Sequence, residues 1–279
     1  MTRALRAVVG RLRGPRIEVK TPGEIDAMRA AGAVVARTLR LVAERTAPGV
    51  STGELDQLAE QTIREAGAVP SFLGYHGFPA SICTSVNSHV VHGIPARSQV
   101  LADGDLASVD CGAILDGWHG DAAVTVPVWE CGPDLLALST VTEQALWAGL
   151  AAVRPGGRLS DIGHAVESVV RPHGYGLLED YTGHGIGTCM HEPPNVPNLA
   201  PQGAGRGMVL EPGIVLAVEP MVTLGSGEVE ELADGWTVVT ADGRQAAHWE
   251  HTVAVTDDGP WVLTAPDGGA SRLGTPTDC

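Results

Sequence analysis

Two short apolar segments of the chain each end in an acidic residue. Residues Leu106 to Asp110 and Val215 to Glu219 superpose at an offset of 109 positions. Two further acids, Asp121 and Glu250, each precede another apolar segment. An isolated carboxylate inside an apolar strand costs several kcal/mol. We therefore expect these four acids to be paired, protonated or bound to metal ions.

The spacing of Asp110 and Asp121 predicts that they share one face of a hairpin. If Asp116 and Gly117 form a two-residue turn, paired residue numbers sum to 233 and Asp110 lies opposite Ala123. Asp121 is then the diagonal neighbour on the same face, with its Cα roughly 7 to 8 Å from that of Asp110. Two carboxylates can close this span by holding one cation. Without a cation the like charges would force one of them to take up a proton.

Histidines occur in glycine-rich surroundings in the same parts of the chain. His92 precedes Gly93, His184 lies between two glycines, and His191 precedes Glu192. A lone histidine is more often a structural residue than a ligand, but neighbouring glycines let the backbone approach a ligand closely. Four carboxylates with imidazole suit a divalent ion such as Mn, Fe or Co, either one ion or two that share bridging oxygens.

Two pairs of amphipathic helices must position these strands. The first helix begins at Thr21 with Pro22 and Glu24 behind it and ends at Pro48, and its Gly32 marks a close packing contact. Ser51 and Glu54 form the capping box of a second helix, which ends at Gly67. A second pair is predicted over residues 139–153 and 160–171, divided by Pro155 and Gly156.

The two helix pairs indicate an internal duplication. A shift of 107 residues places Pro48 on Pro155, Gly49 on Gly156 and Gly67 on Gly174. Strand-like segments follow each pair, at 105–115 and 121–128 in the first half and at 213–218, 236–240 and 247–256 in the second. The pattern predicts an α+β protein whose two halves share an antiparallel sheet covered by helices on one face.

The composition indicates a soluble globular protein. The chain has 279 residues, of which 44% are hydrophobic and 18% charged, and no apolar run is long enough for a membrane span. The net charge of −15 argues against a surface built mainly to bind nucleic acid. Five cysteines without a Cys-x-x-Cys pair predict reduced thiols and a cytoplasmic location.

The first 20 residues differ in charge from the rest of the chain. They hold six basic groups and one acid, Glu18, and therefore carry +5, which leaves −15 − 5 = −20 for residues 21–279. This basic N-terminal arm could contact ribosomal RNA, although a solvated terminus is the commoner explanation. We expect one catalytic body over 21–265, with halves of about 21–130 and 131–265, followed by a C-terminal tail at 266–279.

Many short motifs resemble, in order, those of the bacterial type I methionine aminopeptidases, which have the pita-bread fold. The similarity covers about residues 22–258. It is carried by Gly74-Tyr75-His76-Gly77-Phe78-Pro79, His92-Gly93-Ile94-Pro95, Val109-Asp110, His119-Gly120-Asp121, Gly183-His184-Gly185-Ile186-Gly187, Val218-Glu219-Pro220-Met221 and Trp249-Glu250-His251-Thr252. The interval from His191 to Glu219 is only 28 positions, which is too short for the inserted subdomain of type II enzymes.

This resemblance implies a site with two divalent metal ions, Co, Mn or Fe. Asp121 and Glu250 would bridge the ions, Asp110 would complete one coordination sphere, and His184 with Glu219 would complete the other. The family pattern also gives Glu219 the role of a proton shuttle. A water between the ions would become acidic enough to attack the scissile carbonyl as hydroxide.

The resemblance also implies how the substrate, a nascent polypeptide that begins with methionine, is bound. His191 would hydrogen-bond the carbonyl oxygen of the first peptide bond, and His92 would contact the amide nitrogen on the leaving side. The methionine pocket would be lined by Tyr75, Cys83, Met190 and Trp236. Met190 departs from the aromatic residue that is common at its position. A monomer is the simplest expectation, because the two halves already cover each other.

Three alternatives remain open on the sequence alone. A prolidase or an aminopeptidase P would share the five ligands, but such enzymes usually carry a further N-terminal domain. His119 and Asp121 with a later histidine also resemble the two-histidine, one-carboxylate iron site of oxygenases. A non-catalytic binding protein of the same fold is the third alternative, and the presence of all five ligand positions argues against it.

Overall fold

A curved antiparallel sheet forms the centre of the molecule, which is described by a computed structural model over residues 17–200 and 207–274. Within these residues the sheet has nine strands in the order β1-β4-β5-β14-β9-β7-β8, with β15 on β14 and β2 on β4. The strands are β1 (Val69–Pro70), β2 (Ile82–Val86), β4 (Leu106–Leu115), β5 (Trp118–Pro127), β7 (Gly183–Gly185), β8 (Glu192–Val196), β9 (Val215–Val218), β14 (Glu250–Thr256) and β15 (Gly259–Val262).

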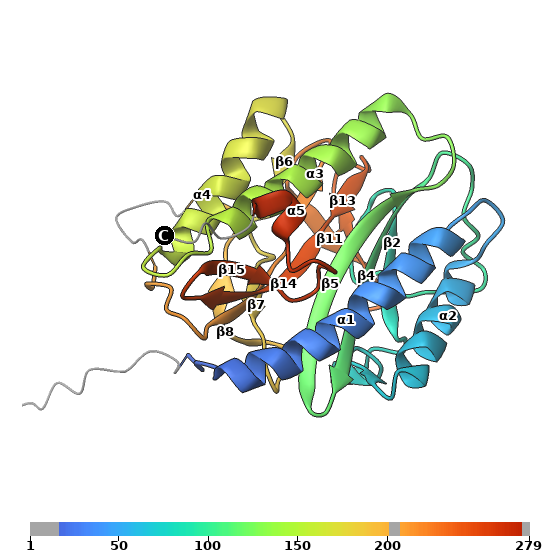
Figure 1. Cartoon of the computed structure of the whole chain (residues 1–279). Coiled ribbons are helices and arrows are strands. Elements are labelled where there is room, and N and C mark those ends of the chain that lie inside the picture. Colours follow the sequence, from blue (N-terminus) through green and yellow to red (C-terminus); the bar gives the residue numbers. More distant parts are fainter. Residues whose placement is uncertain (1–16, 201–206, 275–279) are drawn as a thin grey trace, which may run out of the picture.

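Two helix pairs cover one face of this sheet (Figure 1). The first pair, α1 (Pro22–Arg45) and α2 (Thr52–Glu65), packs against β4, β5 and β2. The second pair, α3 (Pro133–Ala151) and α4 (Leu159–Val170), packs against β9, β14 and β8. Each pair contributes to its own large hydrophobic cluster. The α+β architecture with two similar halves is therefore confirmed.

Local sequence signals explain where the helices begin. Thr21 and Ser51 are N-caps, and each forms the predicted capping box, with Glu24 and Glu54 respectively. The fourth helix begins at Leu159, one residue before the prediction. The third begins at Pro133 rather than at 139, because Gly132 and Pro133 supply an N-terminus that the prediction overlooked. Short helical segments occur at η1 (Tyr75–Gly77), η2 (Arg171–His173) and α5 (Ala270–Leu273).

Glycine pairs allow α1 to lie directly on the sheet. A Cβ atom on Gly32 would lie 2.4 Å from the carbonyl oxygen of Leu263, and one on Gly120 would lie 2.7 Å from the backbone nitrogen of Gly32. Both distances are shorter than any van der Waals contact permits. The close contact predicted for Gly32 is thus present, and it joins α1 to β5 just before Asp121.

Two strand predictions were wrong in detail. Residues 247–256 form two strands, β13 (Ala246–His248) and β14, which are separated at Trp249. The backbone N–H of Trp249 donates to the carbonyl of Pro220, and its indole N–H donates to the Ser139 hydroxyl on α3. These contacts turn the chain from one sheet into the next.

The other error concerns residues 236–240, whose strand β12 (Val238–Thr240) lies outside the central sheet. It pairs with β3 (His89–Val91) and β11 (Val229–Glu231) in a small sheet, because β11 and β12 form a local hairpin. A second small sheet contains β6 (Gly176–Leu177), β10 (Met221–Thr223) and β13.

The ends of the chain are only partly described. Residues 1–16 of the predicted basic arm and residues 275–279 of the predicted tail lie outside the described ranges. Ile17 packs against the hydrophobic cluster of the second half. Near the other end, the guanidinium of Arg272 lies 5.3 Å from the ring centre of Trp147 on α3. Over 17–200 and 207–274, no helix is both long and apolar enough to cross a bilayer.

Candidate active site

The five predicted metal ligands lie on five adjacent strands of the central sheet. Asp110 is on β4, Asp121 on β5, Glu250 on β14 and His184 on β7, and Glu219 directly follows β9. The register confirms the predicted pairing of Asp110 with Ala123, and Glu250 faces the same alanine from the other side. Residues far apart in the chain thus converge because their strands are neighbours.

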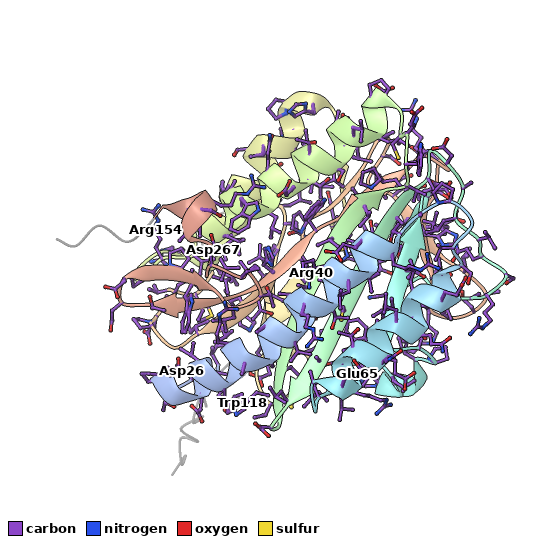
Figure 2. The ribbon with its side chains drawn as sticks, turned by 45° about the vertical axis from the view of Figure 1, so that its right-hand side comes forward. Asp26, Arg40, Glu65, Trp118, Arg154 and Asp267 are labelled. Carbon is purple, nitrogen blue, oxygen red and sulfur yellow. The ribbon has the colours of Figure 1, made fainter. Side chains whose placement is uncertain are left out.

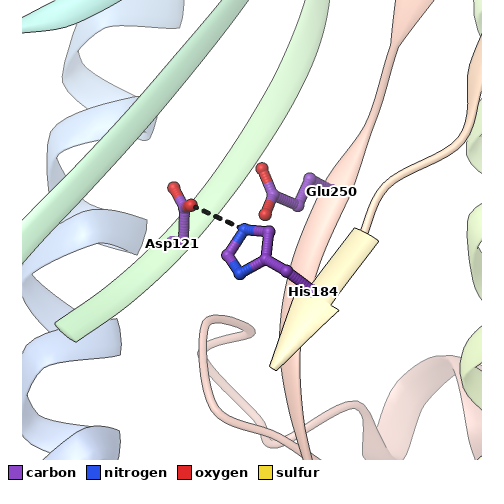
Figure 3. A group of neighbouring side chains, drawn as sticks. All are labelled: Asp121, His184 and Glu250. Carbon is purple, nitrogen blue, oxygen red and sulfur yellow. Dashed lines mark ion pairs between the residues drawn. The ribbon is translucent and has the colours of Figure 1, made fainter. Parts of the chain in front are cut away.

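The donor atoms of Asp121, His184 and Glu250 lie within 4.8 Å of one another, and their side chains point to a common centre (Figure 3). His184 Nε2 is 3.7 Å from Asp121 Oδ2 and also 3.7 Å from Glu219 Oε1. These distances are too long for hydrogen bonds. They suit ligand atoms that surround one divalent cation, because in zinc sites each N or O ligand lies about 2.0 to 2.2 Å from the ion.

The buried carboxylates have oxygen atoms without protein partners. Within the described residues, Asp110 Oδ1, Asp121 Oδ1 and Glu250 Oε1 are buried and accept no hydrogen bond. Buried polar groups are normally satisfied, so each unpaired oxygen needs an explanation. A divalent cation supplies one, because hard oxygen donors with one imidazole match such ions. The residues present therefore fit a divalent metal ion.

Burial and mutual repulsion strongly affect the ionisation of this group. Burial raises the pKa of Glu219 to about 8, and burial together with the Glu219 charge raises that of Asp110 to about 7. The pKa values of Asp121 and Glu250 are raised well above their usual range, first by burial and then by the neighbouring acids. Protons therefore occupy part of the cluster unless cations replace them.

Hydrogen bonds from neighbouring residues hold the donors in place. His184 Nδ1 lies 2.8 Å from the carbonyl oxygen of Gly185, which leaves Nε2 free to face the carboxylates. Burial lowers the pKa of His184 to about 3, so its imidazole is neutral. The Thr252 hydroxyl on β14 donates to the Asp121 carbonyl and accepts from the Asp121 N–H. The Asn198 side-chain amide donates to the Glu219 carbonyl.

A cavity of about 700 Å³ opens onto these groups. Its polar lining includes His92, Asp110, His184, His191, Glu219 and His248. His191 is exposed, and its Nδ1 lies 2.8 Å from the Tyr75 hydroxyl. Burial lowers the pKa of His92 to about 4, and burial also lowers that of His191. Both imidazoles are therefore neutral near pH 7 and can donate a hydrogen bond to a substrate.

His248 is a cavity residue that the sequence analysis missed. It is buried, its Nε2 has no hydrogen-bond partner in the described structure, and this atom lies 3.6 Å from Glu219 Oε2. Its backbone N–H lies within hydrogen-bonding distance of the hydroxyls of Ser108 and Thr125. The available signal was its position two residues before Glu250 in the predicted strand 247–256, where alternate residues would share a face.

The four predicted pocket residues come together in one apolar cluster. Tyr75, Cys83, Met190 and Trp236 pack with Phe72, Phe78, Ala80 and Ile94. Cys83 lies on β2 directly opposite Asp110, so this apolar cluster borders the acids. The only two phenylalanines of the chain are both in it, a compositional signal that the sequence analysis did not use. The ring centres of Phe78 and Trp236 are 5.1 Å apart.

His119 has other contacts. Its Nδ1 lies 3.0 Å from the Ser71 hydroxyl, and it is not a member of the donor group formed by Asp121, His184 and Glu250. This arrangement does not support the oxygenase-like alternative, which needs His119 and Asp121 on the same ion.

Comparisons with known proteins agree with this geometry. The family model of metallopeptidase family M24 matches residues 26–257. The chain is 55% identical to methionine aminopeptidase 1 of Mycobacterium tuberculosis, over 92% of this chain and 98% of that protein. It is 50% identical to methionine aminopeptidase 1 of Bacillus subtilis, over 88% of this chain and 98% of that protein.

Solved structures show the same fold. The methionine aminopeptidase of Rickettsia prowazekii superposes with a TM-score of 0.87 at 39% identity, over 90% of this chain and 100% of the other. A prolidase from Pyrococcus furiosus superposes with a TM-score of 0.71 at 21% identity, over 88% of this chain but 65% of the other, which shows a common fold alone. On these matches the chain belongs to metallopeptidase family M24 and, within it, to the type I methionine aminopeptidases of bacteria.

Proposed function

We propose that this metal-dependent aminopeptidase removes the N-terminal methionine of nascent proteins with two divalent ions, Co, Mn or Fe. The observation that carries the proposal is the set of donors on five adjacent strands, with unpaired carboxylate oxygens beside an open cavity. Asp110, Asp121, His184, Glu219 and Glu250 would hold these ions. When bound, the ions supply Lewis acidity that acidifies a water molecule and polarises the scissile carbonyl.

The residues of the chain handle the proton and the substrate. Glu219 takes a proton from the attacking water and delivers it to the leaving amine nitrogen. His191 donates a hydrogen bond to the carbonyl oxygen as negative charge develops there. His92, on the cavity wall, contacts the nitrogen on the leaving side. His248 Nε2 lies 3.6 Å from Glu219 Oε2 and faces this carboxylate without a direct hydrogen bond.

The apolar cluster supplies specificity for methionine. Tyr75, Cys83, Met190 and Trp236 offer aromatic and sulfur-containing side chains, which pack favourably against a thioether. The Tyr75 hydroxyl contacts His191, so the methionine site is tied to the group that faces the scissile carbonyl. The methionine side chain lies in this cluster, and its α-amino group lies toward the metal ions.

The test is release of free methionine from a Met-Ala-Ser peptide by the full chain, with added Co, Mn or Fe. We expect metal-dependent release from this peptide and little from a Lys-led peptide. Cleavage before proline without methionine preference would favour a prolidase or an aminopeptidase P. Absence of metal-dependent release from every peptide would favour the non-catalytic alternative.

Contacts of the whole enzyme in the cell form a further part of the proposal. We propose that it is a cytoplasmic monomer that meets nascent chains at the ribosome, with residues 1–20 as the docking segment, since their charge is opposite to that of the body. Salt-sensitive ribosome binding that is lost on deletion of residues 1–16 supports this proposal. Unchanged binding of the shortened chain would refute the role of the arm.

A further inference from the structure

The single lysine of the chain is buried beside the active site. Seventeen arginines account for all other Lys and Arg residues, yet position 20 is lysine. The side chain of Lys20 is 2% exposed, and its Nζ lies 2.5 Å from Glu192 Oε2, on a side chain that is 9% exposed. The two residues are 172 positions apart. This buried ion pair therefore joins the start of the first half to the second half.

Glu192 closes the short turn formed by residues 187–192. Its Oε1 accepts a hydrogen bond from the backbone N–H of Cys189, and the N–H of Gly187 donates to the carbonyl of Cys189. A Cβ on Gly187 would lie 2.5 Å from Glu192 Oε1 and 2.6 Å from Cε of Lys20. The ion pair thus packs directly on the backbone of Gly187, and the space there is too narrow for a bulkier side chain.

The turn carries two residues of the proposed substrate site. Met190 is buried in the apolar cluster, and His191 contacts the Tyr75 hydroxyl and lies with its ring centre 4.2 Å from that of His184. Both follow Gly187 by only a few residues. A shift of the turn would therefore move the methionine pocket and the carbonyl-facing histidine together.

Lys20 itself is held firmly on the other side. Its backbone N–H donates to the carbonyl of Gly213, and the next residue, Thr21, is the N-cap of α1. Ile17, three residues earlier, lines the cavity and packs on the core of the second half. Lys20 is consequently a fixed point from which the turn can be positioned.

Energetics favour a positioning role over a stabilising one. Desolvation of two buried charges offsets most of their attraction, so a buried ion pair is weak evidence for added stability. Lysine offers a compact charge on a slim stem, whereas a guanidinium is planar and broad. The narrow space at Gly187 accounts for lysine at this position in a chain that otherwise uses arginine.

We propose that Lys20 is a positioning residue whose ammonium group holds Glu192, and through it the 187–192 turn, so that Met190 and His191 meet the N-terminal methionine correctly. The inference rests on the proposed function of that turn. It adds a specificity-determining contact that lies outside the metal ligands and the pocket.

The test compares Lys20→Met with Arg40→Met in the full chain. Arg40 pairs with Glu44 at 2.7 Å, but both side chains are about 60% exposed, and Arg40 lies on the outer face of α1 (Figure 2). We expect Lys20→Met to lower kcat/KM on Met-Ala-Ser by about 10- to 100-fold, the scale of a small misplacement. The preference for Met-led over Leu-led peptides should fall as well, while Arg40→Met leaves both unchanged.

Two further measurements separate positioning from simple stability. Metal affinity by calorimetry should be unchanged in Lys20→Met, because the ion pair touches none of the five ligands. Lys20→Met combined with Glu192→Gln removes both charges, and it should recover the melting temperature but not the methionine preference. A double variant, or a folded Lys20→Met, with wild-type preference and kcat/KM overturns the inference. An inactive wild-type enzyme would instead count against the proposed function.

Discussion

The two halves of the molecule bring their acids to the site in different ways. In the first half, Asp110 and Asp121 lie on one hairpin, β4–β5, whose two-residue turn has left-handed backbone angles at Asp116 and Gly117. In the second half, Glu219, Glu250 and His184 lie on strands separated by long connections. The first half is therefore organised by local geometry, and the second depends on long-range strand pairing.

The contact between the two halves shows how the local hairpin and the long-range strand pairing build one site. Glu250 on β14 faces Ala123 on β5, and Thr252 on the same strand exchanges two hydrogen bonds with the backbone of Asp121. Because β14 also pairs with β9, it places Glu219 beside the acids of the first half. The candidate metal site therefore depends on one strand junction, β5–β14.

The largest loss of activity is expected when a single proposed metal ligand is removed, whichever half it belongs to. Asp110→Ala in the first half and His184→Ala in the second should each lower kcat/KM by at least about 10³-fold, because members of one catalytic unit act together. Peptide kinetics and metal calorimetry measure both. His119→Ala serves as the control and should lose much less activity. A His119→Ala enzyme that loses its metal, or a ligand variant that keeps full activity, would contradict the single five-ligand site.

A somewhat smaller loss of activity is expected when His191, on the 187–192 turn of the second half, is replaced. His191→Ala should lower kcat by about 10²- to 10³-fold, the range for loss of one donor to a developing oxyanion. Bound metal should stay at the wild-type level, since His191 is not one of the proposed ligands. Steady-state kinetics with metal analysis checks this. A loss of metal in His191→Ala would assign this residue to the metal site instead.

A change at the junction between the halves should weaken metal binding without removing a ligand. Thr252→Val keeps the size of the side chain but deletes both hydrogen bonds to Asp121. We expect a 10- to 100-fold loss of metal affinity, as for other groups that orient ligands. Thr256→Val, on the same strand but bonded to Gly259, is the matched control. Equal calorimetric affinities in the two variants would show that the junction does not set the ligand geometry.

The smallest effect concerns pH and stability of the metal-free protein. The pKa of Asp110 is raised to about 7 and that of Glu219 to about 8, so the folded state holds protons that the unfolded chain releases. Stability should therefore fall from pH 6.5 to 8, by about 2 kcal/mol from these two groups, and the raised pKa values of Asp121 and Glu250 act in the same direction. Histidines with lowered pKa values, such as His92 and His184, change their protonation below pH 6.5. They therefore contribute little to the change in stability between pH 6.5 and 8.

Denaturant unfolding of the chelator-treated protein measures this slope. Glu219→Gln should reduce the decline above pH 7, whereas Asp110→Asn should act at lower pH, because the pKa of Asp110 is the lower of the two. Saturating Mn²⁺ should abolish the slope, because the cation replaces the protons. A metal-free protein whose stability does not fall between pH 6.5 and 8 would show that these acids ionise normally.

The parts that the sequence predicted well are those with local causes. The capping boxes at Thr21 and Ser51 and the pairing of Asp110 with Ala123 follow from neighbouring residues, and the structure confirms them. The assignment of 247–256 to one strand failed because Trp249 bonds Ser139 and Pro220, which are distant in sequence. His248 was missed for the same reason, since its role depends on Glu219.

From the sequence alone we could name the candidate residues for the chemistry and predict how the β4–β5 hairpin aligns two of them, because side-chain type and turn geometry act over a few residues. The folded structure was needed to see that β14 joins the halves, that His248 faces Glu219, and that Lys20 contacts Glu192 across 172 positions. Such contacts arise when strands and turns pack into one core. Which residues meet in these contacts depends on shape complementarity and burial across the whole core, and a local sequence pattern does not show this.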